Sequence, residues 1–210
     1  MQYERARNAL RAQVRLITMK RICIIQGHPT PGGRHFCHAL AYAYADGATD
    51  AGHDVRTIAV AEMDFPLLRS KLDWDSGETP PAIASAQQTI SWAEHLVVIH
   101  PLWVGMMPAL LKGFVEQTFR PGFAMRPSAT GSWTKLLTGR SARVVVTMGM
   151  PALVYRWYFG AHALKSLAQN LALIGIRPCR HTLIGTIEGM SIEKRRTWLD
   201  HLRELGRRGG

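Results

Sequence analysis

The chain has 210 residues, of which 47% are hydrophobic, and its 26 Lys and Arg against 15 Asp and Glu give a net charge of +11. This length allows one substantial hydrophobic core and is short for two. No apolar run reaches the roughly 18 residues of a membrane-spanning helix. No apolar core with a cleavage site follows the first charges, as a secretory signal requires. We therefore expect neither membrane insertion nor secretion.

The three cysteines, Cys23, Cys37 and Cys179, are scattered along the chain and show no Cys-x-x-Cys spacing. This pattern argues against a disulfide framework and against a cysteine-built zinc site. We expect a protein of the reducing cytoplasm, without a metal site, in which all three cysteines pack as small apolar side chains.

Positive charge concentrates toward the two ends of the sequence. We expect most of it on solvated helix faces and tails, and a contribution to binding dinucleotide phosphates is the alternative. Nucleic-acid binding is disfavoured, because the charge lacks the interleaved aromatic surface of single-strand binders. The charged residues at the two ends are Arg5, Arg7, Arg11, Arg15, Lys20, Arg21, Lys194, Arg195, Arg196, Arg203, Arg207 and Arg208.

Residues 1–18 differ from the rest of the chain, because they hold four arginines and one glutamate. A second methionine, Met19, directly precedes the first strand-like run. An Arg-rich, acid-poor stretch resembles an organellar presequence, but the serine enrichment of such presequences is missing. We predict a basic N-terminal extension over residues 1–18, either a short helix or an over-long start, and one domain over residues 19–210.

From Lys20 onward, short β-branched runs alternate with longer helical patterns, which is typical of a parallel sheet covered by helices on both faces. In chain order we predict strand 21–26, helix 34–51, strand 53–60, a long excursion over 62–81, helix 82–94, strand 95–100, helix 109–119, strand 142–147, helix 161–174, strand 180–184 and helix 191–205. In open parallel sheets the ligand lies beyond the carboxyl ends of the strands. The loops after the strands are therefore the candidate site.

The first such loop reads Gly-His-Pro-Thr-Pro-Gly-Gly-Arg-His-Phe over residues 27–36. It leads into a helix N-terminus, where free N–H groups and the helix dipole attract a phosphate. Arg34, His28 and His35 add positive charge. The loop has neither a Walker lysine nor a GxGxxG pattern, and a plain strand–helix turn is the alternative.

Two further loops follow strands. Residues 101–108, Pro-Leu-Trp-Val-Gly-Met-Met-Pro, offer an apolar wall for an aromatic ring, or else a plug beneath the sheet. Residues 147–151, Thr-Met-Gly-Met-Pro, expose backbone N–H groups that could bind a ring carbonyl, or else form a simple loop.

From Met19 to about Leu205 the chain resembles the flavodoxin-like NAD(P)H:quinone oxidoreductases. The block over residues 100–124, His-Pro-Leu-Trp-Val-Gly-Met-Met-Pro-Ala-Leu-Leu-Lys-Gly-Phe-Val-Glu-Gln-Thr-Phe-Arg-Pro-Gly-Phe-Ala, carries most of the resemblance. His28-Pro29, Asp64-Phe65-Pro66, Thr147 and Gly149 also match. The resemblance implies an α/β fold, the flavodoxin-like three-layer sandwich, with a five-stranded parallel sheet in the order 2-1-3-4-5 and helices on both faces.

The resemblance also implies a bound flavin, FMN or FAD, and assigns residues to its parts. The phosphate would be held by His28, Arg34, His35 and Phe36. The edge of the isoalloxazine would lie along Pro101, Leu102, Trp103 and Val104. The pyrimidine end would face Thr147, Met148, Gly149 and Met150, and a catalytic Tyr/His pair would be Tyr155 and His162.

The chain departs from this family at several positions. The usual Thr-Thr-Gly-Gly is Thr147-Met148-Gly149-Met150, and His162 is one residue out of register. Val104 replaces a tryptophan, and Met125 stands where the pocket rim often has a tyrosine. For Tyr155, packing within an aromatic run is the alternative role.

By this resemblance, the chain is an NAD(P)H dehydrogenase (quinone)-like enzyme and a homodimer. NADPH or NADH would pass hydride to the flavin and leave, and a quinone or similar small acceptor would then take two electrons, in a ping-pong cycle. One alternative is a flavodoxin-type electron carrier, but such carriers are expected to be acidic and this chain is basic. The other is a flavin-binding regulatory subunit of a membrane transporter.

Overall fold

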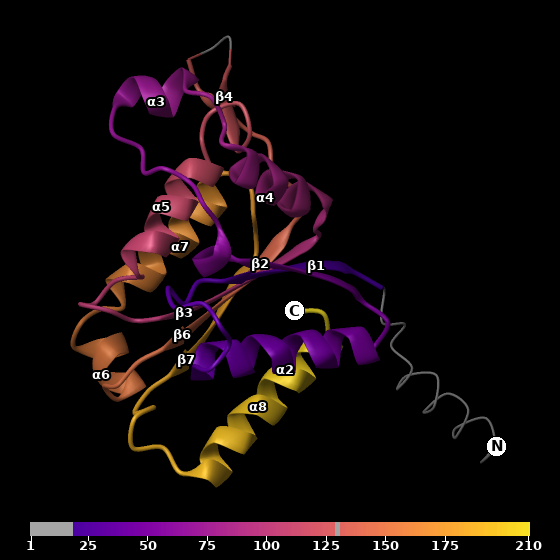
Figure 1. Ribbon diagram of the computed structural model, residues 1–210, viewed down its shortest axis with the longest axis vertical. Helices are drawn as coiled ribbons and strands as arrows, with labels where there is room; N and C mark the ends of the chain where they lie inside the picture. Colours follow the sequence, from indigo (N-terminus) through magenta and orange to yellow (C-terminus); the bar gives the residue numbers. More distant parts are fainter. Residues whose placement is uncertain (1–18, 129–130) are drawn as a thin grey trace, which may run out of the picture.

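The structure, a computed structural model, describes residues 19–128 and 131–210 (Figure 1). The predicted basic extension, residues 1–18, lies outside the described residues, so the division at Met19 stays a prediction. No helix in the described ranges has the length and apolar character needed to cross a membrane.

A sheet of five parallel strands forms the centre of the molecule, in the order β2-β1-β3-β6-β7. The predicted order 2-1-3-4-5 differs from this only because two strands of a separate hairpin, β4 and β5, come between the third and fourth sheet strands in the chain. The fold class is therefore confirmed. The sheet strands are β1 Arg21–Gln26, β2 Asp54–Ala59, β3 His95–Pro101, β6 Ser141–Thr147 and β7 Cys179–Ile184.

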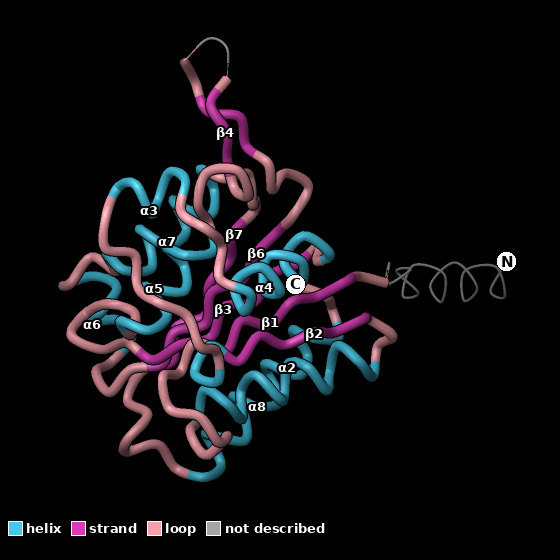
Figure 2. The backbone as a smooth tube through the Cα atoms, turned by 45° about the horizontal axis from the view of Figure 1, so that its top comes forward, coloured by secondary structure: helices cyan, strands magenta, loops and turns pink. Residues whose placement is uncertain are grey.

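Helices cover both faces of this sheet (Figure 2). On β3, Leu96 packs into one core and the adjacent Val97 into the other, as expected of a strand buried on both faces. One face carries α2 Phe36–Asp50 and α8 Ile192–Arg207, and the other carries α4 Pro81–Trp92, α5 Ala109–Thr118 and α7 His162–Leu173.

Several short elements were not predicted. They are the 3-10 turn η1 Val60–Glu62, the helices α3 Lys71–Ser76 and α6 Ala152–Trp157, and the hairpin strands β4 Met125–Pro127 and β5 Trp133–Lys135. The excursion predicted over residues 62–81 thus contains a helix, which begins after Ser70, whose Oγ accepts the N–H of Asp73 at 3.1 Å.

A buried arginine fixes this excursion to the sheet domain. Arg120 is 5% exposed, and its guanidinium donates to the carbonyls of Asp73 at 2.8 Å and Gly77 at 3.2 Å. It also donates to the Glu78 carbonyl at 3.3 Å and to Thr79 Oγ1 at 2.9 Å. The long connection is therefore an ordered part of the fold.

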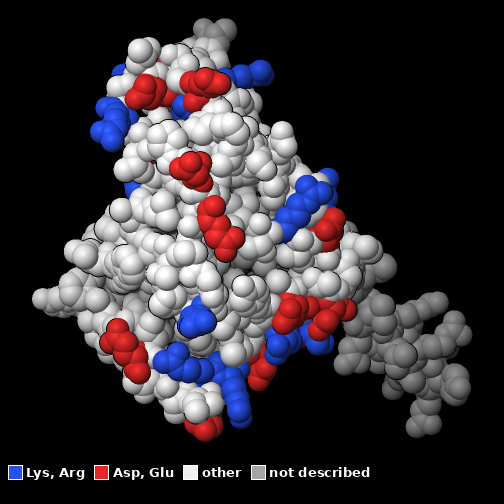
Figure 3. Space-filling view, in the orientation of Figure 1, with Lys and Arg blue, Asp and Glu red and all other residues white. Residues whose placement is uncertain are grey.

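On the face shown in Figure 3, basic and acidic side chains lie in small scattered groups with broad uncharged areas between them. On α8, Arg203 lies 3.9 Å from Asp46, and Arg207 lies 3.4 Å from Asp50, both on α2. These exposed pairs agree with the expectation that basic residues near the C-terminus occupy a solvated helix face.

Candidate functional site

The three candidate loops meet at the carboxyl edge of the sheet. The N–H of Gly27, at the end of β1, donates to the Ile99 carbonyl on β3 at 2.8 Å. The N–H of Leu102, after β3, donates to the Thr147 carbonyl at the end of β6, also at 2.8 Å. The Sγ of Cys37 in the first turn of α2 lies 3.1 Å from Thr147 Oγ1. These three contacts join the loops side by side along one edge of the sheet.

Three histidines gather where the first loop enters α2. The ring of His28 stacks on that of His35, with centroids 4.0 Å apart, and His38 lies 5.2 Å away. Trp103 from the second loop approaches His28 edge-on at 6.2 Å. His38 was not among the predicted site residues. His38 lies three residues after His35, which is the spacing of a capping box. The His35 N–H donates to the Nδ1 of His38 at 3.3 Å.

The electrostatics of this cluster favour an anion. Burial, followed by repulsion from His35 and His38, lowers the pKa of His28 to about 4. Burial also lowers the pKa of His38. The first turn of α2 has no acidic residue, and the N–H groups of Phe36 and Cys37 have no intrahelical acceptor because they begin the helix. A phosphate bound here would accept hydrogen bonds from free N–H groups. Its negative charge would also favour protonation of the neighbouring imidazoles.

The second loop is a tight turn that presents apolar side chains. Trp103 and Met106 exchange two backbone hydrogen bonds of 2.9 Å around Val104 and Gly105, whose φ angles are +49° and +75°. Two residues with positive φ are typical of a type I′ turn. Val104 is fully exposed and Trp103 is half-exposed, while Met107 packs into the core. The turn therefore offers an aromatic surface at the sheet edge.

The third loop leaves backbone donors free. The Met148 N–H donates to the Ile184 carbonyl at 2.9 Å, and the Met150 carbonyl accepts from Thr186 at 3.1 Å. The N–H groups of Gly149 and Met150 donate to no acceptor within residues 19–128 and 131–210. They are available to a ligand carbonyl.

The carboxylate of Glu188 lies over Gly149. A Cβ added at Gly149 would come within 3.0 Å of Glu188 Oε1, so this glycine gives the loop room for the carboxylate. Sequence reasoning did not find Glu188, because only the packing of the loop after β7 brings it to this edge.

Tyr155, on α6, is buried inside the fold, and its hydroxyl group contacts the start of α7. Its side chain is 1% exposed, and its phenolic oxygen accepts the N–H of Leu164, the third residue of α7, at 3.3 Å. Ala161 precedes the helix with φ +49° and has no side-chain cap to offer, so the phenol satisfies a helix-end donor in its place. Burial raises the pKa of Tyr155. His162, the first residue of α7, is exposed and packs against Gly160.

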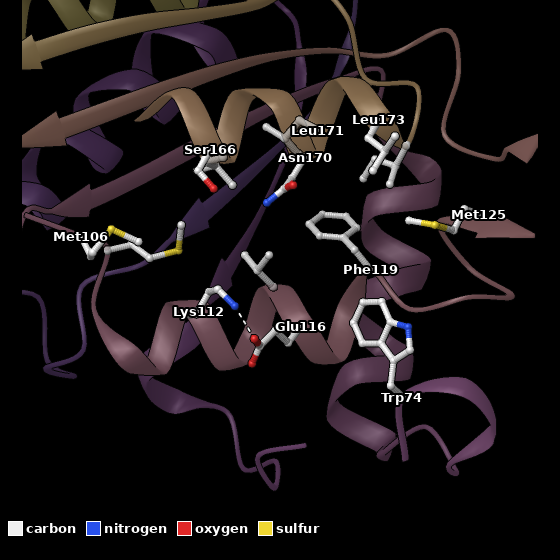
Figure 4. Close-up of a pocket in the computed structure, with 14 residues that line it drawn as sticks. Trp74, Met106, Lys112, Glu116, Phe119, Met125, Ser166, Asn170, Leu171 and Leu173 are labelled. Carbon is white, nitrogen blue, oxygen red and sulfur yellow. Dashed lines mark hydrogen bonds and ion pairs between the residues drawn. The ribbon is translucent and has the colours of Figure 1, made fainter. Parts of the chain in front are cut away.

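An apolar groove of about 300 Å³ runs between α5 and α7 (Figure 4). Met106 of the second loop lies at one end, and Trp74 and Met125 lie at the other. An ion pair between Lys112 and Glu116 borders it on α5. Met106 belongs to both the second loop and the lining of the groove, so the groove borders the candidate site.

The geometry is that of an α/β protein that binds a ligand at the carboxyl edge of a parallel sheet. The chain belongs to the flavodoxin-like fold family, whose sequence profile matches residues 20–205. The resemblance inferred from the sequence is thereby confirmed at the level of the fold family.

Individual relatives are distant. The chain is 28% identical over 129 residues to an uncharacterized NAD(P)H oxidoreductase of Haemophilus influenzae, a match that covers 60% of this chain and 63% of that protein. A second curated relative is matched over 57% of its length.

Solved structures share the fold at low identity. The NAD(P)H:quinone oxidoreductase from Methanothermobacter marburgensis superposes with a TM-score of 0.76 at 20% identity, over 90% of this chain and 96% of that one. An FMN-dependent NADH-azoreductase from Bacillus anthracis gives a TM-score of 0.73 at 16% identity, over 90% and 99%.

Proposed function

We propose that the protein is a flavin-dependent oxidoreductase that transfers hydride from NADH or NADPH to quinones or similar small acceptors by a two-electron, ping-pong cycle. The observation that carries this proposal is the meeting of three loops at one sheet edge: an anion-attracting helix start, a half-exposed tryptophan and two free N–H donors. The names of the relatives, an NAD(P)H oxidoreductase, a quinone oxidoreductase and an FMN-dependent azoreductase, agree with it.

The residues present fit a flavin mononucleotide unit. His28, Arg34, His35 and Phe36 surround the start of α2, where a phosphate would bind. The free N–H groups of Gly149 and Met150 suit a ring carbonyl. When bound, the flavin supplies the capacity to accept and donate hydride.

The chain itself would position the reactants and stabilise charge. Pro101, Leu102, Trp103 and Val104 would line one edge of the ring and exclude water from it. The N–H groups of Gly149 and Met150 would donate to the ring carbonyl, where negative charge grows on reduction. Thr147 and Met148 would hold this loop through their backbone bonds. Tyr155 and His162 would be additional donors.

We also propose that the enzyme is a homodimer. α6 and the residues after it expose a run of large apolar side chains directly beyond the third loop: Leu153, Val154, Trp157, Tyr158 and Phe159. Contiguous exposed apolar surface of this kind marks interaction sites. A second copy covering α6 would bury this surface beside the flavin.

The proposal is tested by titrating the purified protein with FMN, FAD and riboflavin and then measuring NAD(P)H oxidation with a free quinone. We expect near-stoichiometric flavin binding and turnover. His35→Ala should weaken FMN binding by about tenfold, as expected for loss of one interaction with a charged group, and should affect riboflavin little. His201→Ala, an exposed histidine on α8, is the matched control.

Failure to bind either FMN or FAD would overturn the proposal and leave only the fold. Flavin binding without NAD(P)H oxidation would instead favour the electron carrier or the regulatory subunit. Light scattering of the purified protein tests the homodimer separately.

A further inference from the structure

A second pocket lies at the opposite, amino edge of the sheet, where β3 and β6 begin and β7 follows Pro178. Its volume is about 220 Å³, and no described residue that lines it has an acidic side chain. The lining residues are Lys20, His95, Ser141, Ala142, Pro178, Arg180 and Gly210. The sheet strands are six or seven residues long, so about 20 Å separates this pocket from the candidate flavin site.

His95 contributes a buried nitrogen without a partner. The side chain is 2% exposed, and Nδ1 lies 2.8 Å from Ser141 Oγ. Nε2 is shielded from solvent and has no hydrogen-bond partner among the described residues. When the Ser141 hydroxyl donates to Nδ1, the ring proton is on Nε2, which is then a free donor. Buried polar atoms in folded proteins are nearly always satisfied, so this one indicates an unseen partner.

Arg143 is not among the lining residues, but it adds a buried charge close enough to act on His95. It is 6% exposed, and one guanidinium nitrogen donates to Thr182 Oγ1 at 3.0 Å. Its Nε has no partner, and no carboxylate pairs with it in the described parts of the chain. A buried guanidinium without a counter-charge is costly, because burial removes its hydration and no protein anion replaces it.

The strand register explains why these groups gather. Arg143 is paired with Arg180 on β7, and His95 is paired with Ser141. Paired residues of parallel strands point to the same face, and alternate residues of one strand do too. Lys20, two residues before Ile22, shares the face on which Ile22 packs against α2 and α8. Burial, then repulsion from Lys20, Arg143, Arg180 and His53, lowers the pKa of His95 to about 3.

We propose that this pocket binds a small dianionic oxyanion of the phosphate class, free or as a phosphate monoester, through Lys20, Arg180 and the Nε2–H of His95. Lys20 is already held in place, since its Nζ donates to the Gly209 carbonyl at 2.7 Å, and two of its protons remain for a ligand. The anion would supply the counter-charge that Arg143 lacks. This inference does not depend on the proposed flavin chemistry.

The test is calorimetric titration of the full chain with inorganic phosphate at constant ionic strength, with and without saturating FMN. We expect one phosphate per chain in the presence of FMN. Arg180→Gln and Lys20→Gln should each raise the dissociation constant about tenfold or more, as for loss of a charge-assisted hydrogen bond. Arg196→Gln removes the same charge from an exposed position on α8 and should leave binding unchanged.

Equal affinity in Arg180→Gln and Arg196→Gln would overturn the proposal. So would loss of phosphate binding on addition of FMN, which would place the anion at the start of α2 instead. Titration with glycerol phosphate distinguishes the sources: tighter binding than inorganic phosphate indicates a phosphate monoester, and weaker binding indicates the free anion.

Discussion

Single residues in the candidate site link flavin binding to protons. His28 has a pKa of about 4 because it is buried and lies beside His35 and His38, so it is neutral near pH 7. A bound phosphate would attract protons to these rings and raise their pKa values. The complex would then hold more protons than the free protein, and binding would strengthen as pH falls.

We expect the affinity for FMN to increase as the pH is lowered from about 8 to about 6.5, above the second phosphate pKa near 6. Fluorescence titration at each pH measures this dependence, and riboflavin should show little of it. His28→Gln should flatten the FMN profile. A profile equally steep for riboflavin would place the responsible proton away from the phosphate.

Tyr155 has two roles to separate, because its phenol caps α7 and is also a proposed donor to the flavin. Tyr155→Phe leaves the buried Leu164 N–H unpaired, so we expect a loss of about 1 kcal/mol in the free energy of unfolding. If the phenol also stabilises the reduced flavin, reduction by NAD(P)H should slow by about tenfold with flavin content unchanged. Urea unfolding and stopped-flow reduction measure the two effects. Tyr42→Phe, on an exposed tyrosine of α2, is the control. A stability loss with an unchanged reduction rate would leave Tyr155 with the capping role alone.

Among the elements, the turn of the second loop carries local strain. Val104 is β-branched and adopts a φ of +49°, a conformation that Asn and Gly accept far more readily. Its side chain is fully exposed, so packing does not compensate for the strain.

Val104→Asn should therefore raise the free energy of unfolding by about 1 kcal/mol. Gly105→Ala, at a φ of +75°, should lower it. Urea denaturation of both variants without flavin checks the pair. A destabilised Val104→Asn would mean that the valine makes a contact elsewhere, such as with a second copy.

The sequence predicts long elements well and short ones poorly, for physical reasons. β1 has the predicted bounds, because its continuous apolar run, residues 22–25, is what a strand buried on both faces requires. α3 and α6 have six residues each, too few for a helical period to stand out.

The candidate site was predictable only in part. Its loops were found because a parallel sheet places its ligand at the carboxyl ends of the strands. The position of Glu188 over Gly149 and the bond between Tyr155 and Leu164 arise from tertiary packing, which has no local pattern. The unpaired groups belong to His95, the first residue of β3, and to Arg143 within β6, and no sequence pattern shows that a polar atom in a strand lacks a partner.

For the whole molecule, buried histidines make folding sensitive to acid. Burial lowers the pKa of His100 to about 4 and that of His95 to about 3, both below the ordinary 6.5. The folded protein then binds fewer protons than the unfolded chain below pH 6.5. Stability is full above this pH and is lost as pH falls toward these values.

We expect each of these histidines to contribute a slope of up to about 1.4 kcal/mol per pH unit between roughly pH 6 and pH 4.5. Urea unfolding at several pH values measures the slope. His100→Gln should remove one histidine's share, and His201→Gln, which changes an exposed ring, should remove none. Identical slopes in both variants would assign the acid sensitivity to other groups.

Because Cys37 contacts Thr147, the reactivity of its thiol can be used to measure how often α2 separates from β6 in the native protein. The thiol joins the first turn of α2 to the end of β6, and burial raises its pKa to about 11. An alkylating reagent can reach the Cys37 thiol only when the helix separates from the strand. The rate of alkylation therefore reflects the frequency of this separation. A ligand that spans the loops beside α2 and β6 should slow alkylation of Cys37 in proportion to its occupancy. The half-buried Cys179, far along the chain on β7, provides the internal reference.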